Sequence, residues 1–141
     1  VFTAAELPEA RALLVRELVP DTKRLLKVFG RHCAREVVGL LRDEDHAAVQ
    51  HAARAAAEIA DDSKGRAALL QCLGSVEALT GCLGSADGET SKFAYKALVK
   101  LVKKDSTARA TLKRVVAADE GGAVKAALAT HPDLGDLVIG S

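Results

Sequence analysis

Two stretches of the chain repeat the same pattern of residue types 42 positions apart, and this repeat constrains the fold more than any other feature. Segment 34–41 reads AREVVGLL and segment 76–83 reads VEALTGCL. Apolar, glycine and turn positions coincide at Ala34/Val76, Val37/Leu79, Leu40/Cys82, Leu41/Leu83, Gly39/Gly81 and Asp45/Asp87. A fixed period of this length predicts one supersecondary unit stacked on copies of itself.

The match continues into the segments that follow. The same offset pairs Ala52/Ala94, Ala56/Leu98, Ile59/Leu101 and Ala60/Val102 and, after one inserted residue, Arg66/Arg109 and Leu69/Leu112. A weaker third copy begins at Gly122, and segment 10–41 is an earlier copy with altered spacing. We therefore expect a single domain over residues 1–141, built of about three units that cover 1–46, 47–88 and 89–141.

The units show the period of an α-helix, interrupted by glycines and capping residues. Apolar residues recur at three- and four-residue spacing, and Asp or Ser precedes several of these runs. We expect helices over 9–19, 23–29, 35–42, 47–60, 64–72, 76–83, 89–103, 107–118 and 123–130, with N-caps at Asp21 or Thr22, Asp62 or Ser63, Ser75, and Asp105 or Ser106. No stretch alternates with period two, so we expect no β-sheet.

The composition favours stacked helices over a β-sandwich or barrel. Aromatic residues make up only 3% and Trp, Met and Asn are absent, whereas alanine is abundant. Alanine has the highest helix propensity and lets helices approach closely. The net charge of +1 provides no global attraction to nucleic acid or membrane. No apolar run reaches the roughly 18 residues of a spanning helix, so we expect no membrane insertion.

The cysteines indicate a reducing environment. The chain has an odd number of cysteines, Cys33, Cys72 and Cys82, and none of them forms a CxxC motif. We expect reduced, mostly buried thiols in an intracellular protein. The alternative is a disulfide between Cys72 and Cys82, which requires Cα atoms within about 7 Å of each other.

Segment 49–83 resembles the armadillo repeat family, with HEAT repeats as the near neighbour. It reads VQHAARAAAEIADDSKGRAALLQCLGSVEALTGCL: an Ala-rich helix entered through Val-Gln, a polar turn, an Arg-led helix, a glycine break and a short Leu-rich helix. The resemblance implies an all-α, right-handed α-solenoid of about three armadillo-like repeats, whose third helices, here 35–42, 76–83 and 123–130, line a concave binding face. Peptide-gripping members of the family use Asn and Trp on that helix; this chain has neither, which favours side-by-side contact with a protein.

Motifs for catalysis or metal binding do not stand out from the sequence. The glycines fall at helix ends rather than in a phosphate-binding loop, and no nucleophile elbow is present. His46 and His51 are five residues apart, a spacing that does not direct both rings to one ion on a helix, and His32 lies next to Cys33. We expect no enzyme activity, no cofactor and no metal.

Basic residues form the most prominent surface feature. Segment 85–118 holds eight basic and three acidic residues, a local balance of +5. We define the basic ridge as Lys92, Lys96, Lys100, Lys103, Lys104, Arg109 and Lys113. Arg35 and Arg42 add positive charge on segment 35–42, the third helix of the first unit. We expect these residues to contact an acidic surface of another protein, whereas the scarcity of aromatic residues speaks against nucleic acid. The alternative is an ordinary solvated face.

These features predict a non-enzymatic protein–protein interaction scaffold in a larger intracellular assembly. We expect a cytoplasmic location, with an organelle or a cytoskeletal assembly as the alternative, and have no prediction of oligomeric state. Two other functions compete with this one. An adaptor or transport-receptor fragment would bind a peptide in the concave groove. A HEAT-like enzyme of the phycobilin lyase type would need a pocket with clustered Asp, Arg or His.

Overall fold

The computed structural model describes residues 8–118, 123–132 and 134, and all regular structure in this part of the chain is helical. The elements are α1 (Pro8–Leu18), α2 (Thr22–Phe29), a 3₁₀ turn η1 (Gly30–Cys33), α3 (Ala34–Leu40), α4 (His46–Ile59), α5 (Ser63–Gln71), α6 (Ser75–Leu83), α7 (Gly88–Lys104), α8 (Ser106–Ala117) and α9 (Ala123–Ala129). The predicted all-α class is confirmed, and the predicted helices agree with these bounds to within one or two residues.

Aspartates begin five of the helices. Asp21, Asp62 and Asp105 each accept a hydrogen bond from the backbone N–H three residues later, at 3.3, 2.6 and 2.9 Å. Asp45 and Asp87 cap α4 and α7 by accepting from the N–H two residues later. These bonds satisfy N–H groups that the first turn of a helix leaves without an intrahelical partner.

The predicted cap at Ser75 is wrong. Ser75 is the first residue of α6, and Gly74 occupies the cap position with φ of 78° and no side-chain hydrogen bond to the helix. This left-handed conformation is accessible to glycine because it has no Cβ. The backbone therefore reverses at Gly74 before α6 begins.

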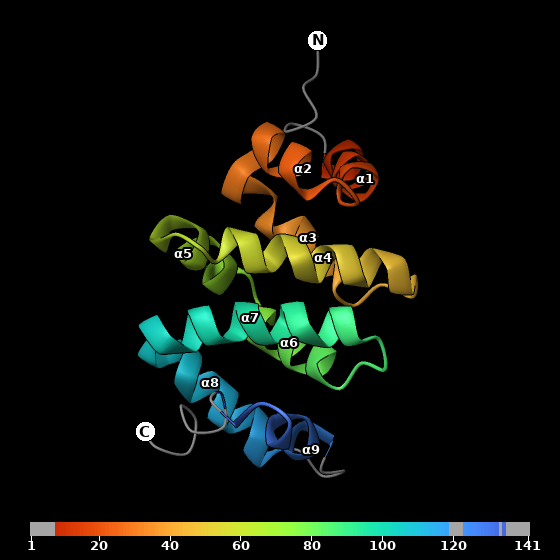
Figure 1. Cartoon of the computed structure of the whole chain (residues 1–141). Helices are drawn as coiled ribbons and strands as arrows, with labels where there is room; N and C mark the ends of the chain where they lie inside the picture. The colour runs from red at the N-terminus through yellow and green to blue at the C-terminus, as the bar shows by residue number, and fades with distance from the viewer. Residues whose placement is uncertain (1–7, 119–122, 133, 135–141) are drawn as a thin grey trace.

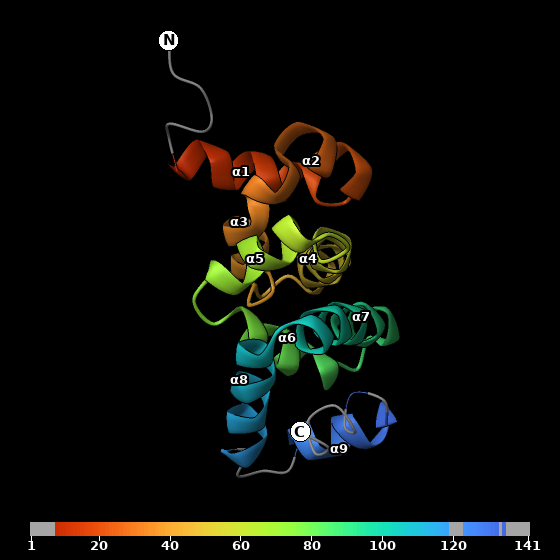
Figure 2. The same cartoon turned by 90° about the vertical axis from the view of Figure 1, so that its left-hand side faces the viewer.

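The helices follow one another along a single direction (Figures 1 and 2). α1 and α2 lie at one end, α8 and α9 at the other, and the two long helices α4 and α7 run side by side between them. α3 packs against α4, and α6 packs against α7, behind the long helices in the view of Figure 1. The core thus lies between successive layers, and one surface of α4 and of α7 stays exposed.

Burial in the middle of the molecule recurs with the sequence offset of 42. Every buried residue of α7 has a buried counterpart 42 positions earlier, in the pairs Ala48/Thr90, Ala52/Ala94, Ala55/Ala97, Ala56/Leu98, Ile59/Leu101 and Ala60/Val102. The α3 and α6 segments agree in the same way at Ala34/Val76, Val37/Leu79, Val38/Thr80, Leu40/Cys82 and Leu41/Leu83. These eleven pairs are buried in both members, whereas Ala53 and Ala57 are buried and their counterparts Tyr95 and Val99 are only partly buried.

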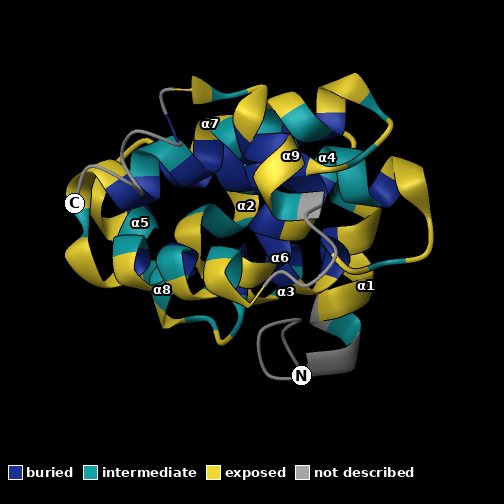
Figure 3. Cartoon of the chain, turned by 90° about the horizontal axis from the view of Figure 1, so that it is seen from below, coloured by how far each residue is buried: buried dark blue, intermediate teal, exposed yellow. Residues whose placement is uncertain are grey.

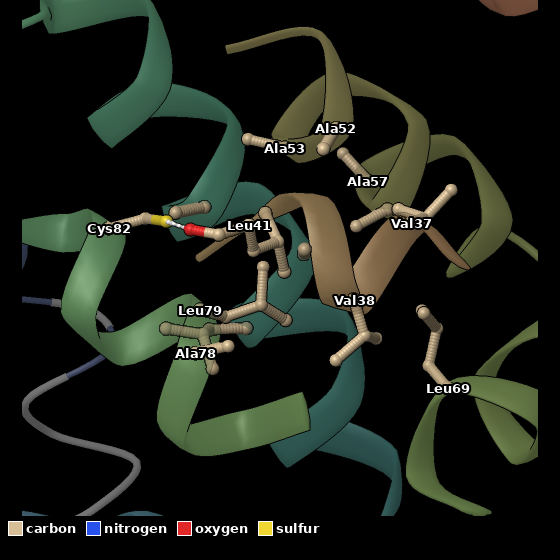
Figure 4. Packing of buried hydrophobic residues seen from close by; sticks show 14 of the residues in the cluster. Val37, Val38, Leu41, Ala52, Ala53, Ala57, Leu69, Ala78, Leu79 and Cys82 are labelled. Carbon is tan, nitrogen blue, oxygen red and sulfur yellow. Dashed lines mark hydrogen bonds between the residues drawn. The ribbon is translucent and has the colours of Figure 1, made fainter. Parts of the chain in front are cut away.

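The centre of the core joins α3, α4 and α6 (Figure 4). Val37 lies beside Ala57 of α4, whereas Leu41 lies on the side of Leu79 in α6. The Cys82 thiol donates a hydrogen bond to the Leu41 carbonyl oxygen over 3.8 Å. All three cysteines are free, so the alternative of a Cys72–Cys82 disulfide is not formed.

Two arginines bind the ends of the long helices in the same manner. Arg66 on α5 donates from Nη1 to the carbonyl oxygens of Ala60 and Asp61, at 3.1 and 3.2 Å. Arg109 on α8 donates from Nε and Nη2 to the Val102 carbonyl oxygen, at 3.2 and 3.1 Å. A cation at a helix C-terminus is favourable because the last carbonyl oxygens carry partial negative charge. Each long helix is thereby tied to the helix that follows it.

Candidate partner-binding surfaces

The expectation that the third helices form a binding face does not hold for α6. Of its residues, only Glu77 and Gly81 are exposed, because α6 packs against α7, α8 and α9. Seen along the stack, buried residues gather between α6, α7 and α4, while exposed residues lie on the outer side of α7 (Figure 3). Surface available to a partner is therefore found mainly elsewhere, on the long helices and around α3.

The lysines of the basic ridge differ in exposure and in whether other residues bind their ammonium groups. Lys92, Lys96, Lys103 and Lys104 are exposed on α7. The Lys100 ammonium, by contrast, donates to the Ala57 carbonyl oxygen over 2.8 Å and forms an ion pair with Asp61. Lys100 thus joins α7 to the end of α4. Its ammonium group is less available to a partner than those of the exposed lysines.

The ridge does not continue in a straight line onto α8. Figure 2 shows α7 nearly end-on while α8 runs away from it, so the axes of the two helices diverge. Arg109 is half-buried and bound to Val102, and Lys113 is half-buried as well. Arg109 and Lys113 are therefore less exposed than Lys92, Lys96, Lys103 and Lys104 of α7.

One cluster does form on the exposed side of α4 and α7. The half-buried ring of Phe93 has the Arg54 guanidinium 5.1 Å from its centroid, and the Lys92 and Lys96 ammonium nitrogens at 5.5 and 5.7 Å. We call Arg54, Lys92, Phe93 and Lys96 the Phe93 platform. None of its three cations forms an ion pair with a residue in the described part of the chain. The face of an aromatic ring attracts cations, which holds the three charges close together.

The sequence analysis included Lys92 and Lys96 but missed Arg54. A signal was present, since Arg54 lies 42 positions before Lys96 and thus at the matched position of the preceding long helix. Because α4 and α7 lie side by side, matched positions become neighbours across the two helices. The offset that aligns the core could therefore have been applied to the exposed residues too.

Arg35 and Arg42 lie apart from the ridge. They line a hollow of about 600 Å³ between η1, α3 and α5, together with Arg31 and His32. No residue of the basic ridge or of the Phe93 platform lines this hollow. Arg35 and Arg42 thus lie at a different place on the protein from the exposed lysines of the ridge.

The pKa values of one ion pair and of two thiols are shifted. The Arg16 guanidinium donates to the Asp43 carboxylate at 2.6 Å and lowers the pKa of that carboxyl, which also accepts from the Asp45 N–H. Burial raises the pKa of the Cys82 thiol. Burial, and then the negative charge of Glu36, raises the pKa of the Cys72 thiol. These thiols stay protonated at neutral pH and are weak nucleophiles.

Metal-ligating residues do not gather in the described part of the chain. No group of three or more His, Cys, Asp or Glu side chains is placed there to hold an ion. The Cys33 thiol instead donates to the Gly30 carbonyl oxygen at 3.2 Å. Within residues 8–118, 123–132 and 134, no helix has both the length and the apolar character to cross a membrane.

Comparison with protein-family models, with curated proteins and with solved structures found no match to this chain. The site must therefore be interpreted from its own geometry.

Proposed function

We propose that this protein is a non-enzymatic, armadillo-like α-solenoid that acts as an interaction scaffold inside the cell and binds an acidic surface of a partner protein through the Phe93 platform. The observation that carries the proposal is the gathering of Arg54, Lys92 and Lys96 around one half-buried aromatic ring. The exposed lysines Lys103 and Lys104 extend the positive charge along α7.

Three regularities support the solenoid. Six buried positions of α4 and its C-terminal end recur in α7 at an offset of 42. Asp21, Asp62 and Asp105 cap α2, α5 and α8 with the same three-residue hydrogen bond. Arg66 and Arg109 bind the ends of the preceding long helices. These agree with three units of three helices, α1–α3, α4–α6 and α7–α9, in which each unit packs on the next.

An acidic partner is favoured by electrostatics. Three like charges within a few ångströms of one ring repel each other, and carboxylates on a partner relieve this repulsion while the ring adds apolar contact area. Nucleic acid is less favoured, since binding single strands relies on several aromatic side chains that stack successive bases, and this surface has one. The three free cysteines agree with a reducing compartment.

The test is affinity capture from the source cells with the double variant Lys92→Glu/Lys96→Glu. The matched control is Lys23→Glu/Lys27→Glu, which makes the same charge change at the same four-residue spacing on exposed positions of α2. We expect wild type and control to retain an acidic partner, identified by mass spectrometry, and the Lys92/Lys96 variant to lose at least nine tenths of it.

Circular dichroism of the same samples shows whether the variants keep their helices. If all three proteins are equally helical and capture the same partners in equal amounts, the Phe93 platform is not a binding site and the proposal is wrong. If the control loses the partner as well, overall charge rather than the platform governs binding, and this also contradicts the proposal.

A further inference from the structure

We propose that the hollow between η1, α3 and α5 is a second binding site, and that it takes an acidic peptide segment of a partner protein whose carboxylates bind arginine while an adjacent apolar side chain packs on Leu73. We call this site the arginine hollow. Its volume of about 600 Å³ is enough for several side chains. The proposal goes beyond the function proposed above, because the arginine hollow shares no residue with the Phe93 platform.

The charge of the arginine hollow has one sign. Arg31, His32, Arg35 and Arg42 line it, and none of its lining residues within 8–118, 123–132 and 134 is acidic. Arg31 and Arg35 are exposed, and neither forms an ion pair within the described part of the chain. Glu36, although next to Arg35 in sequence, lines a different hollow together with Arg16 and Asp43. Its negative charge reaches Cys72 in the arginine hollow, where it is outnumbered by three arginines. The positive charges of this rim therefore remain available to an anion.

Arg42 is held in place before any ligand binds. Its Nη2 donates to the Gly74 carbonyl oxygen at 2.9 Å, which fixes the guanidinium at the start of α6. A Cβ at position 74 would lie 2.5 Å from that nitrogen, and Gly74 has φ of +78°, so only glycine fits here without strain. A guanidinium carries five N–H donors, of which this bond uses one. The remaining donors match the two oxygens of a carboxylate.

An apolar contact lies directly beside the charges. Ala34 and Val38 are buried at the floor of the arginine hollow, and Ala68 and Cys72 are half-buried in its wall. Leu73 is 97% exposed, far more than Leu13 at 65%, the next of the exposed large hydrophobic side chains. Leu73 also lines the adjoining hollow of about 510 Å³ between α5, α6 and α8. An apolar side chain at the junction of two hollows offers a partner favourable burial.

These features together favour an acidic peptide over nucleic acid. Carboxylates and an apolar side chain can alternate within a few residues of a peptide, which suits arginines placed next to Leu73. A phosphodiester backbone would satisfy the arginines but leave Leu73 without an apolar contact. No Phe, Tyr or Trp lines the arginine hollow to stack a base.

The experiment selects ligands from a library of eight-residue peptides with three Asp or Glu and one or two apolar positions. The whole chain serves as bait, and a library with Lys in place of the acids serves as reference. The strongest binders are then measured by fluorescence anisotropy against wild type, Arg31→Ala/Arg35→Ala, Leu73→Ser and the control Lys23→Ala/Lys27→Ala. All substituted positions are exposed, so the fold is expected to persist.

We expect enrichment from the acidic library only. The dissociation constant should rise at least tenfold in Arg31→Ala/Arg35→Ala and about threefold to tenfold in Leu73→Ser, and stay within twofold of wild type in the control. Bound peptide should also slow alkylation of Cys72, which lines the hollow, by at least threefold in peptide mass mapping. Absence of enrichment over the Lys library, or equal affinity in all variants, overturns the proposal.

Two further arms separate the other outcomes. A labelled single-stranded oligonucleotide that binds with the same dependence on Arg31 and Arg35, when no acidic peptide does, identifies a nucleic-acid site and overturns the proposal. Peptide binding that is lost only in Lys92→Glu/Lys96→Glu belongs to the Phe93 platform, so it contradicts this inference while leaving the proposed function in place. Peptide binding that persists in that variant, with the expected loss in Arg31→Ala/Arg35→Ala, supports the arginine hollow by itself.

Discussion

The long helices α4 and α7 lie side by side and bury matched positions, yet they fill these positions with side chains of different size. In α4 and the residue after it, five of the six matched positions hold alanine, with Ile59 as the exception. In α7 the same positions include Leu98, Leu101 and Val102. At these six positions burial is conserved between the two helices while side-chain size is not, so each layer is filled by a different combination of side chains.

The exposed sides of the two helices differ in another way. Gln50, His51 and Arg54 of α4 correspond to Lys92, Phe93 and Lys96 of α7. Only the pair Arg54/Lys96 keeps its charge, and this pair joins the Phe93 platform. The two helices therefore share buried positions but present different side chains on their exposed sides, apart from the basic pair Arg54/Lys96.

The largest expected effect on stability comes from changing the side-chain size at a matched core position. Leu98→Ala should lower the free energy of unfolding by about 2–5 kcal/mol, because the side chain is fully buried and its removal leaves a cavity. Chemical denaturation followed by circular dichroism measures this change. At the matched position, Ala56→Leu should destabilise by about 1–3 kcal/mol through overpacking. If Ala56→Leu were neutral, the two positions would not be equivalent.

The turn after each long helix offers the second test. A Cβ at Gly65 would lie 1.7 Å from the Ile59 carbonyl oxygen, a backbone atom that cannot move away easily, whereas the corresponding residue of α8 is Ala108. Gly65→Ala should therefore cost about 1–3 kcal/mol. The reverse change, Ala108→Gly, should cost about 1 kcal/mol through helix propensity. Thermal melting measures the effect of both substitutions. A larger drop in melting temperature for Gly65→Ala would show that the turn between α4 and α5 is the more tightly packed one. An equal or smaller drop would contradict this.

The aspartates that cap α5 and α8 provide a test in which the two helices should lose stability by similar amounts. Asp62→Ala and Asp105→Ala should each destabilise by about 1 kcal/mol, since each removes the acceptor for an N–H of the first turn. Denaturation midpoints measure the change, and Asn at either position is the control because its side-chain oxygen can still accept. A lower denaturation midpoint in one variant and not in the other would show that only one of these caps stabilises the protein.

The smallest effect concerns the ion pair that joins α1 to the turn before α4. The Arg16–Asp43 hydrogen bond lowers the pKa of Asp43 in the folded protein. The stability that this pair contributes is present above the unfolded-state pKa and is lost as the pH falls through the folded-state pKa. In Arg16→Gln, the pKa of the Asp43 carboxyl measured by NMR should rise. The effect on unfolding should be slight, because Arg16 is exposed and Asp43 is only half-buried, so solvent and salt screen the pair.

Most of the secondary structure could be predicted from the sequence, since Asp caps and helical spacing act locally. The caps were placed at Asp62 or Ser63 and at Asp105 or Ser106 for this reason, and the structure has the aspartate in both cases. The buried pairs followed from the offset. Ser75 was assigned wrongly because Gly74 takes the left-handed conformation that ends one turn and starts the next. The candidate surfaces were harder to predict. Whether Lys100 is free depends on its distance to Ala57 in another helix, and the arginine hollow depends on how α3 packs against α5.

The alanines of α4 have a consequence for how this layer forms. An alanine side chain has no rotamers to lose on folding, whereas leucine and isoleucine give up about 0.5–1 kcal/mol each in conformational entropy. The helix at the centre of the molecule therefore becomes ordered with little entropic penalty from its own core residues. The same short side chains let neighbouring helices approach α4 closely, so lengthening one of them would force the residues packed against it to shift.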